Sequence, residues 1–134
     1  KKMTLALARE LSRRMTEEGA KRGNKLVVSI VDENARPVLT EVMDDAFLAS
    51  YDVANRKAYT SVALKASTAQ LAAAVKSGGV LDGLDDHDGL IFLGGGAPLK
   101  VNGRIIGGIG ISGGTASEDT AYAEIAERIF DELV

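Results

Sequence analysis

Apolar residues recur at helical spacing near the start of the sequence. Those three or four positions apart are Leu5, Ala8, Leu11 and Met15. With charged residues between them, this pattern predicts an amphipathic helix from Thr4 to Lys21. Residues 26–31 form a β-branched run and residues 37–43 resume an extended pattern, so the polar turn between them predicts a β-hairpin.

Helical spacing returns in the middle of the chain. It predicts a helix over 46–64, with the Asp44–Asp45 pair capping its start and complementing the helix dipole. The buried stripe predicted for this helix consists of Phe47, Tyr51, Ala54, Ala58 and Val62. A shorter helix is predicted over 68–76, with Ser67 as its cap.

The carboxyl-terminal part is predicted to hold three short strands and a last helix. The strands are residues 90–93, 98–101 and 104–112, and the Asn-Gly pair between the last two favours a type I′ hairpin turn. Residues 115–118 match a helix capping box. Strands joined by hairpins indicate an antiparallel sheet with helices against it. We therefore expect one α+β domain over residues 1–134.

Composition narrows the class of function. The net charge is −3 and no Lys/Arg block occurs, so we expect no nucleic-acid partner. The chain lacks cysteine, which excludes thiolate catalysis and zinc–thiolate sites. No apolar run approaches the roughly 20 residues that span a bilayer, so we expect no membrane partner. We take a cytoplasmic location as the default.

Glycine is concentrated in one part of the sequence. Thirteen of the fifteen glycines lie between Gly78 and Gly114, although glycine destabilises strands and helices by roughly 0.5–1 kcal/mol relative to alanine. The segment 113–115 precedes the last helix, where free N–H groups attract anions. Residues 108–113 match G-x-G-x-x-G only formally, because they fall in a predicted strand. Alternatively, the glycines let a strand pack closely on a helix or a neighbouring subunit.

One face of the middle helix carries candidate chemistry. Lys57 and Thr60 project from it three residues apart, together with Asp52 and Arg56. A lysine with a lowered pKa acts as a base or forms a Schiff base. The alternative is a solvated face on which Asp52 and Arg56 form an i,i+4 pair.

His87 is the only histidine of the chain and lies in an acidic, irregular stretch. It is a candidate general base or haem ligand, because histidine titrates near neutrality. The alternative is an exposed loop residue. A single histidine without cysteine excludes a multi-histidine metal site in one subunit, and the aspartates around it lack calcium-loop spacing. We therefore predict no metal site.

Three motifs resemble a known family. Residues 52–60 resemble the D-x-A-x-x-K-A-x-T helix of GlcG/HbpS-like proteins, the haem-degrading domain family, which includes the carboxyl-terminal domain of PduO-type corrinoid adenosyltransferases. Residues 94–99 resemble its G-G-G-x-P-[LIV] turn, and residues 107–119 resemble its G-x-[IV]-G-[IV]-S-G-G-x-x-x-x-D motif. The resemblance covers nearly the whole chain.

This resemblance implies a profilin-like α/β/α fold with a five-stranded antiparallel sheet, in homo-oligomers. It also implies an accessory role in glycolate or diol utilisation, or haem binding in redox sensing. The histidines proposed as haem ligands in some members lie nearer the amino terminus, where this chain has none. The remaining candidates for an iron ligand are His87, Met43, a tyrosine or a lysine.

Three hypotheses follow. The first is a small-ligand-binding accessory protein with haem or another tetrapyrrole as the first candidate ligand. Its predicted binding residues are Lys57, Thr60, Gly94, Gly95, Gly96, Ser112, Gly113, Gly114, Thr115 and Asp119. The second is an enzyme acting on a small organic acid, aldehyde or diol-derived metabolite, with Lys57 as catalytic base or cation. The third is a structural module whose glycines serve oligomerisation.

Overall fold

Four helices and four strands make up the described part of the chain. The computed structural model describes residues 1–76, 78, 79, 81, 83 and 88–134. In chain order the elements are α1 (Leu5–Arg22), β1 (Val27–Asp32), β2 (Pro37–Val42), α2 (Leu48–Ala63), α3 (Thr68–Ala74), β3 (Gly96–Val101), β4 (Arg104–Ser112) and α4 (Ala116–Leu133). The strands form one antiparallel sheet in the order β2-β1-β4-β3. The predicted α+β class is confirmed.

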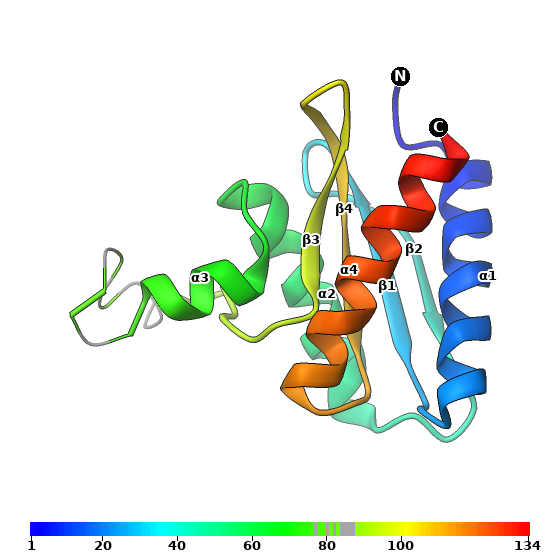
Figure 1. The fold of residues 1–134 in the computed structure, drawn as a ribbon, viewed down its shortest axis with the longest axis horizontal. Helices are drawn as coiled ribbons and strands as arrows, with labels where there is room; N and C mark the ends of the chain where they lie inside the picture. The colour runs from blue at the N-terminus through cyan, green and yellow to red at the C-terminus, as the bar shows by residue number, and fades with distance from the viewer. Residues whose placement is uncertain (77, 80, 82, 84–87) are drawn as a thin grey trace.

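The helices cover the two faces of this sheet in separate layers. Helices α1 and α4 lie side by side on one face, α2 lies on the other, and α3 projects beyond the β3 edge (Figure 1). Strands β1 and β4 pair in the centre of the sheet, so they join the amino-terminal hairpin to the carboxyl-terminal one. No helix in the described ranges is both long and apolar enough to cross a bilayer.

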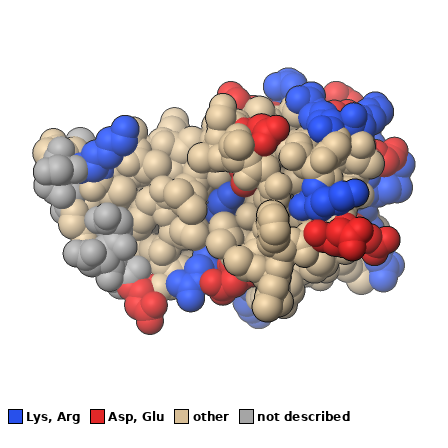
Figure 2. Space-filling model, turned by 90° about the horizontal axis from the view of Figure 1, so that it is seen from below, with Lys and Arg blue, Asp and Glu red and all other residues tan. Residues whose placement is uncertain are grey.

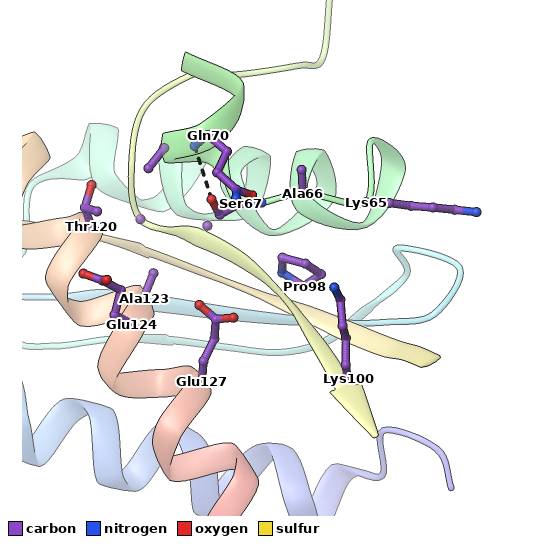
Figure 3. A pocket seen from close by; sticks show the side chains of 13 residues that line it. Lys65, Ala66, Ser67, Gln70, Pro98, Lys100, Thr120, Ala123, Glu124 and Glu127 are labelled. Atoms are coloured by element: carbon purple, nitrogen blue, oxygen red, sulfur yellow. Dashed lines mark hydrogen bonds between the residues drawn. The ribbon is translucent and has the colours of Figure 1, made fainter. Parts of the chain in front are cut away.

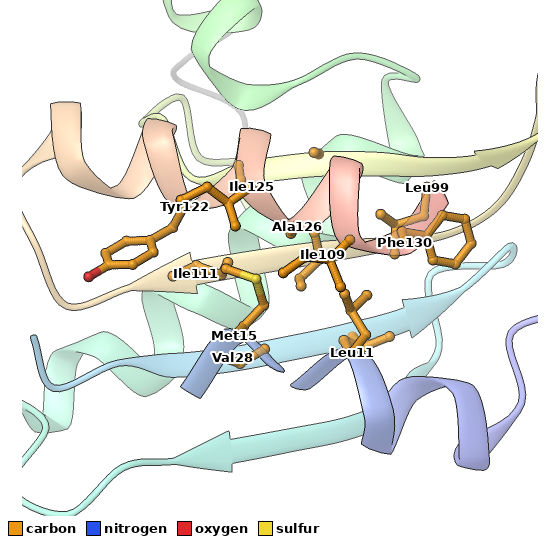
Figure 4. Packing of buried hydrophobic residues seen from close by; sticks show 14 of the residues in the cluster. Leu11, Met15, Val28, Leu99, Ile109, Ile111, Tyr122, Ile125, Ala126 and Phe130 are labelled. Atoms are coloured by element: carbon orange, nitrogen blue, oxygen red, sulfur yellow. The ribbon is translucent and has the colours of Figure 1, made fainter. Parts of the chain in front are cut away.

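The main hydrophobic core lies between the sheet and the helices α1 and α4 (Figure 4). Its buried side chains include Leu11, Met15, Val28, Leu99, Ile109, Ile111, Tyr122, Ala126 and Phe130. Strand residues contribute at every second position, as expected for a sheet, and the helices contribute at three- and four-residue spacing.

Local signals at the starts of α3 and α4 behave as the sequence predicts. The Thr115 hydroxyl accepts a hydrogen bond from the Glu118 N–H, and the Glu118 carboxylate accepts one from the Thr115 N–H. Ser67 and Gln70 form the same reciprocal box at the start of α3. These bonds satisfy N–H groups that have no partner within a helix. The predicted capping box is therefore confirmed.

Helix α2 packs very closely on β4 because glycines face it. A Cβ atom at Gly110 would lie 2.6 Å from the Ala58 nitrogen and 3.0 Å from the Lys57 Cβ. A Cβ atom at Gly108 would lie 2.7 Å from the Val62 side chain. The prediction that the glycines allow close packing of a strand on a helix is confirmed here. The covering helix belongs to the same chain, so these glycines are not free for subunit packing.

The start of α2 differs from the prediction. Phe47 is the N-cap and makes no side-chain capping bond, and Asp45 lies in a turn with φ of 68°. The prediction that Asp44 or Asp45 caps the helix is wrong, because that turn precedes the cap. Phe47 and Tyr51, which we expected in the buried stripe, are 79% and 52% exposed.

The predicted strand over 90–93 is also wrong, because these residues have no strand conformation. The backbone N–H of Ile91 donates to the Thr60 hydroxyl, at 3.0 Å, instead of to a strand. The Thr60 hydroxyl on α2 thus takes the place of the backbone carbonyl that a neighbouring strand would have offered to Ile91. The described part of the chain accordingly has four strands in its sheet instead of the expected five.

Candidate functional site

Residues from three predicted parts of the site meet at one hollow. Lys57 of α2, Ser112 at the end of β4, and Gly114 and Asp119 around the start of α4 all line it. Its volume is about 290 Å³. The remaining lining residues are Phe47, Ala49, Ser50, Val53, Leu93 and Ala116. Antiparallel pairing brings these elements to the same end of the sheet, where α2 begins and β4 ends (Figure 1).

A buried ion pair lies in the wall of this hollow. The Lys57 Nζ is 3.0 Å from the Asp119 Oδ2 and donates to the Ile111 carbonyl at 2.9 Å. The two side chains are only 2% and 5% exposed. The Asp119 Oδ1 accepts a hydrogen bond from the Gly114 N–H at 2.9 Å. The pair therefore connects α2, the end of β4 and the first turn of α4.

Burial acts against both charges of this pair. It lowers the pKa of Lys57, while the charge and hydrogen bond of Asp119 oppose that change. Burial likewise raises the pKa of Asp119, against the opposing effects of Lys57 and of the Gly114 and Gly113 N–H groups. Removing charges from water disfavours the charged forms. Lys57 is thus held closer to its neutral, nucleophilic form than a lysine in solution.

The glycine turn over 94–96 lies directly against the ion pair. A Cβ atom at Gly95, where φ is 125°, would lie 2.8 Å from the Lys57 Nζ. One at Gly96 would lie 2.5 Å from the Lys57 carbonyl oxygen, and one at Gly94 would overlap the Thr120 hydroxyl. Side chains at these positions would displace Lys57 or α4. The turn therefore encloses the pair instead of lining the hollow.

The other predicted binding residues have partners within the chain. Thr60 is fully buried and holds Ile91, as described above. The N–H groups of Gly114 and Thr115 donate to carboxylates of α4 itself, so the chain supplies its own anions at this helix start. Gly113, with φ of 147°, packs on the backbone at residues 25–26. His87 lies outside the described residues.

Sequence reasoning missed the apolar rim of the hollow. Phe47 and Leu93 line it and are 79% and 48% exposed. Leu48 and Tyr51 on the first turn of α2 are also exposed, at 91% and 52%. Figure 2 shows this end of the molecule: charged side chains gather toward α1, and the middle is mostly uncharged. The sequence did carry a signal for this rim. Phe47, Leu48 and Tyr51 place apolar residues on more than one side of the predicted helix, so they could not all face the core.

The described residues provide no evident metal site. They contain no group of three or more histidine, aspartate or glutamate side chains that could hold an ion. Met43 accepts a hydrogen bond from the Leu26 N–H, at 3.2 Å from its Sδ, and does not line the hollow.

Fold and site together define the class: an α/β/α domain with a buried lysine–aspartate pair beside an apolar hollow. Residues 3–127 match the family model described as "Haem degrading protein HbpS-like". The chain belongs to this family, and the resemblance found in the sequence is confirmed.

Three relatives illustrate the match. The chain is 36% identical to an uncharacterised 15.0 kDa protein from the dhaT–dhaS intergenic region of Citrobacter freundii, over 98% of this chain and 94% of that protein. It is 43% identical to the corrinoid adenosyltransferase PduO of C. freundii over 75% of this chain but only 31% of PduO. The solved PduOC–haem complex superposes with a TM-score of 0.90 and 35% identity, over 96% and 94% of the two chains.

Proposed function

We propose that the chain is a small-ligand-binding accessory protein whose ligand is a tetrapyrrole such as haem. The observation that carries this proposal is the hollow with an exposed apolar rim at Phe47 and Leu93. Exposed apolar patches beside a concave surface mark binding sites. The similarity to the PduOC–haem complex supports the choice of ligand.

The lining residues fit the ring of a tetrapyrrole better than its metal. Phe47, Val53 and Leu93 offer apolar surface for a flat aromatic ligand. Among the lining side chains Lys57 is the only nitrogen donor, and its Nζ is engaged by Asp119 and Ile111. We therefore propose recognition of the ring face, with no role for the lining residues as iron ligands.

The size of the hollow favours a contribution from a second copy of the chain. Its volume of about 290 Å³ is at the lower limit of ligand pockets, which run from about 300 to 1,000 Å³. It would thus cover one side of a tetrapyrrole. Leu48 and Tyr51 extend the exposed apolar surface beside it. We propose that a homo-oligomer covers the rest, as the family resemblance implies.

Parallel absorbance titrations with hemin and iron-free protoporphyrin IX test this proposal. We expect both to bind with similar affinity, because the ring is the recognised part. The double variant Phe47→Ala/Leu93→Ala should weaken both by about tenfold, since apolar contact area is lost. Tyr59→Ala is the matched control: it removes an exposed aromatic from α2 outside the hollow.

Three results would overturn the proposal in different ways. A featureless hemin titration of the unaltered protein removes haem as ligand. Equal weakening by Tyr59→Ala shows that the hollow is not the site. Loss of hemin but not protoporphyrin binding in His87→Ala would assign recognition to the iron and its ligand. Light scattering with and without hemin then tests whether a second copy takes part.

A second candidate is catalysis by Lys57 on a small aldehyde or organic acid. It is favoured by the lowered pKa of Lys57 beside the hollow. Treatment with propionaldehyde and borohydride, followed by peptide mass spectrometry, tests a Schiff base. Selective trapping at Lys57 over the exposed lysines supports this candidate, and equal or no modification at Lys57 excludes the Schiff base.

The wider setting of the protein rests on the resemblance. Roles in glycolate or diol utilisation or in redox sensing, a cytoplasmic location and the profilin-like variant of the fold stay predictions. The alternative of a purely structural module loses its original support, because α2 of the same chain covers Gly108 and Gly110.

A further inference from the structure

Two serine hydroxyls in the wall of the hollow beside Lys57 lack a partner in the described part of the chain. Ser50 on the first turn of α2 and Ser112 at the end of β4 both line this hollow, and they are only 6% and 7% exposed. Neither hydroxyl forms a hydrogen bond with the described residues. No polar side-chain atom in these ranges is both without a partner and fully enclosed. The two Oγ atoms are therefore exposed to the hollow that their residues line.

The polar capacity left among the side chains of this hollow is that of hydrogen-bond donors. A lysine ammonium group has three N–H donors, and the Ile111 carbonyl and the Asp119 carboxylate take two of those on Lys57. Both oxygens of Asp119 are occupied, Oδ2 by Lys57 and Oδ1 by the Gly114 N–H. Two hydroxyls and one ammonium N–H thus remain, and a ligand has to supply the acceptor for them.

The start of α2 adds a positive potential to the same hollow. Its N-cap, Phe47, makes no side-chain capping bond, whereas Thr115 caps α4. Phe47 and Ala49 line the hollow, so the uncapped first turn of a 16-residue helix lies in its wall. The unpaired N–H groups and the helix dipole at such a start favour an anion. A negatively charged acceptor therefore fits this hollow better than a neutral one.

A larger hollow at the β3 edge provides a contrast. It has a volume of about 430 Å³ and lies between the start of α3, strand β3 and helix α4 (Figure 3). Two lysines and two glutamates place exposed charges of both signs around it. The Ser67 hydroxyl in its wall accepts the Gln70 N–H. The described residues that line this larger hollow include no buried hydroxyl without a partner, so it has no counterpart of Ser50 and Ser112.

We propose that Ser50, Ser112 and Lys57 bind a carboxylate group of the ligand. A carboxylate only accepts hydrogen bonds, has two oxygens that serve several donors at once, and carries the negative charge that the start of α2 favours. The apolar rim at Phe47 and Leu93 then contacts the rest of the ligand. This inference rests on the proposed function, because both use the same hollow. The carboxylate belongs either to a propionate side chain of a tetrapyrrole or to a small free acid.

Paired ligands that differ only at the carboxylate test the proposal and separate the two sources. Absorbance titrations in one detergent buffer compare protoporphyrin IX with its dimethyl ester. If a propionate is recognised, the acid should bind at least about tenfold more tightly than the ester, because a charge-assisted hydrogen bond contributes roughly this factor. Amide NMR titrations compare butyrate with butyramide. If a free acid is recognised, only butyrate should shift the resonances of residues 47–50 and 112–116.

A double variant locates the effect. Ser50→Ala/Ser112→Ala should weaken the carboxylate ligand about tenfold or more and leave its ester or amide unchanged. Its midpoint of urea denaturation should equal that of the unaltered protein, because neither hydroxyl has a partner in the described part of the chain. Ser117→Ala is the matched control: it removes an exposed hydroxyl on the first turn of α4, outside the hollow, and should change neither binding nor stability.

The proposal is overturned if protoporphyrin IX and its ester bind equally well and butyrate causes no localised shifts. It is also overturned if the double variant binds the carboxylate ligand as the unaltered protein does. Failure of the proposed function looks different: no porphyrin binds at all, and the butyrate titration then decides on the carboxylate site alone. The paired ligands need no variant, so they decide the matter even if a substitution disturbs folding.

Discussion

The two faces of the sheet are built from different kinds of residue. Beneath α1 and α4, large apolar side chains such as Leu11, Ile109 and Phe130 form one extended core. Beneath α2, the apolar cluster is much smaller, and Lys57 and Thr60 are buried beside it. One face is held mainly by apolar burial, and the other by close backbone approach and specific polar contacts.

This difference means that the face carrying the site depends on individual contacts, whereas the other face depends on the total apolar area that it buries. Apolar burial contributes roughly 25 cal/mol per Å² without directional requirements, so the α1–α4 face tolerates conservative changes. Buried polar groups are stable only with partners. Among the described residues, no fully buried side-chain nitrogen or oxygen lacks one. The stability of the α2 face therefore depends on individual hydrogen bonds and ion pairs. Lys57 and the hollow beside it lie on this face.

The largest effect is expected for Gly110→Val, which adds a side chain between β4 and α2. The new Cβ would lie 2.6 Å from the Ala58 nitrogen, so the helix must move away. We expect a loss of more than about 4 kcal/mol in the free energy of unfolding, measured by urea denaturation. The neighbouring change Ile109→Val alters the opposite face and should lose only about 1 kcal/mol. Equal losses would contradict the contrast between the faces.

A large effect is also expected for Lys57→Met, because the Asp119 carboxylate is left buried without its cation. Breaking a buried pair costs about 3–5 kcal/mol. Lys57→Met/Asp119→Asn should recover most of this loss in the same denaturation experiment. The asparagine oxygen can still accept the Gly114 N–H, and no charge remains buried. A double variant as unstable as the single one would show that the charge is not the cause.

A moderate effect is expected for Thr60→Val. The change keeps the shape of the side chain but removes the oxygen that accepts the Ile91 N–H. We expect a loss of about 1–3 kcal/mol and faster hydrogen exchange at the Ile91 amide. Thr60→Ser retains the oxygen and should preserve slow exchange. If both variants exchange alike, the hydroxyl does not hold the 90–93 segment.

The smallest effect is expected for Arg56→Ala on the exposed side of α2. The Arg56 Nε is 3.0 Å from the Asp52 Oδ2 in an i,i+4 pair, as the alternative of a solvated helix face predicts. Exposed pairs of this type contribute about 0.3–0.5 kcal/mol. Asp52→Ala is the matched test and should give the same small change. A loss comparable to that of Lys57→Met would mean that the outer side of α2 also carries specific contacts.

The sequence by itself determined the features that depend on neighbouring residues. The Asn102–Gly103 turn has positive φ at both positions and joins β3 to β4. The Thr115–Glu118 capping box starts α4. Both act over three or four residues, so their residue types are sufficient to predict them. The alternating and helical patterns predict most elements for the same reason, and the family motifs drew attention to Lys57 and the glycine turn.

Only the tertiary structure decided which distant residues become partners. Asp119 pairs with Lys57 across 62 positions of sequence, and Thr60 takes the N–H of Ile91 that a strand would have used. Phe47 is exposed although its spacing predicts burial, because it is the N-cap that precedes the first turn of α2 and does not lie on the side of the helix that contacts β4. A local pattern records that a residue is apolar or charged. The packing of remote segments determines what it meets.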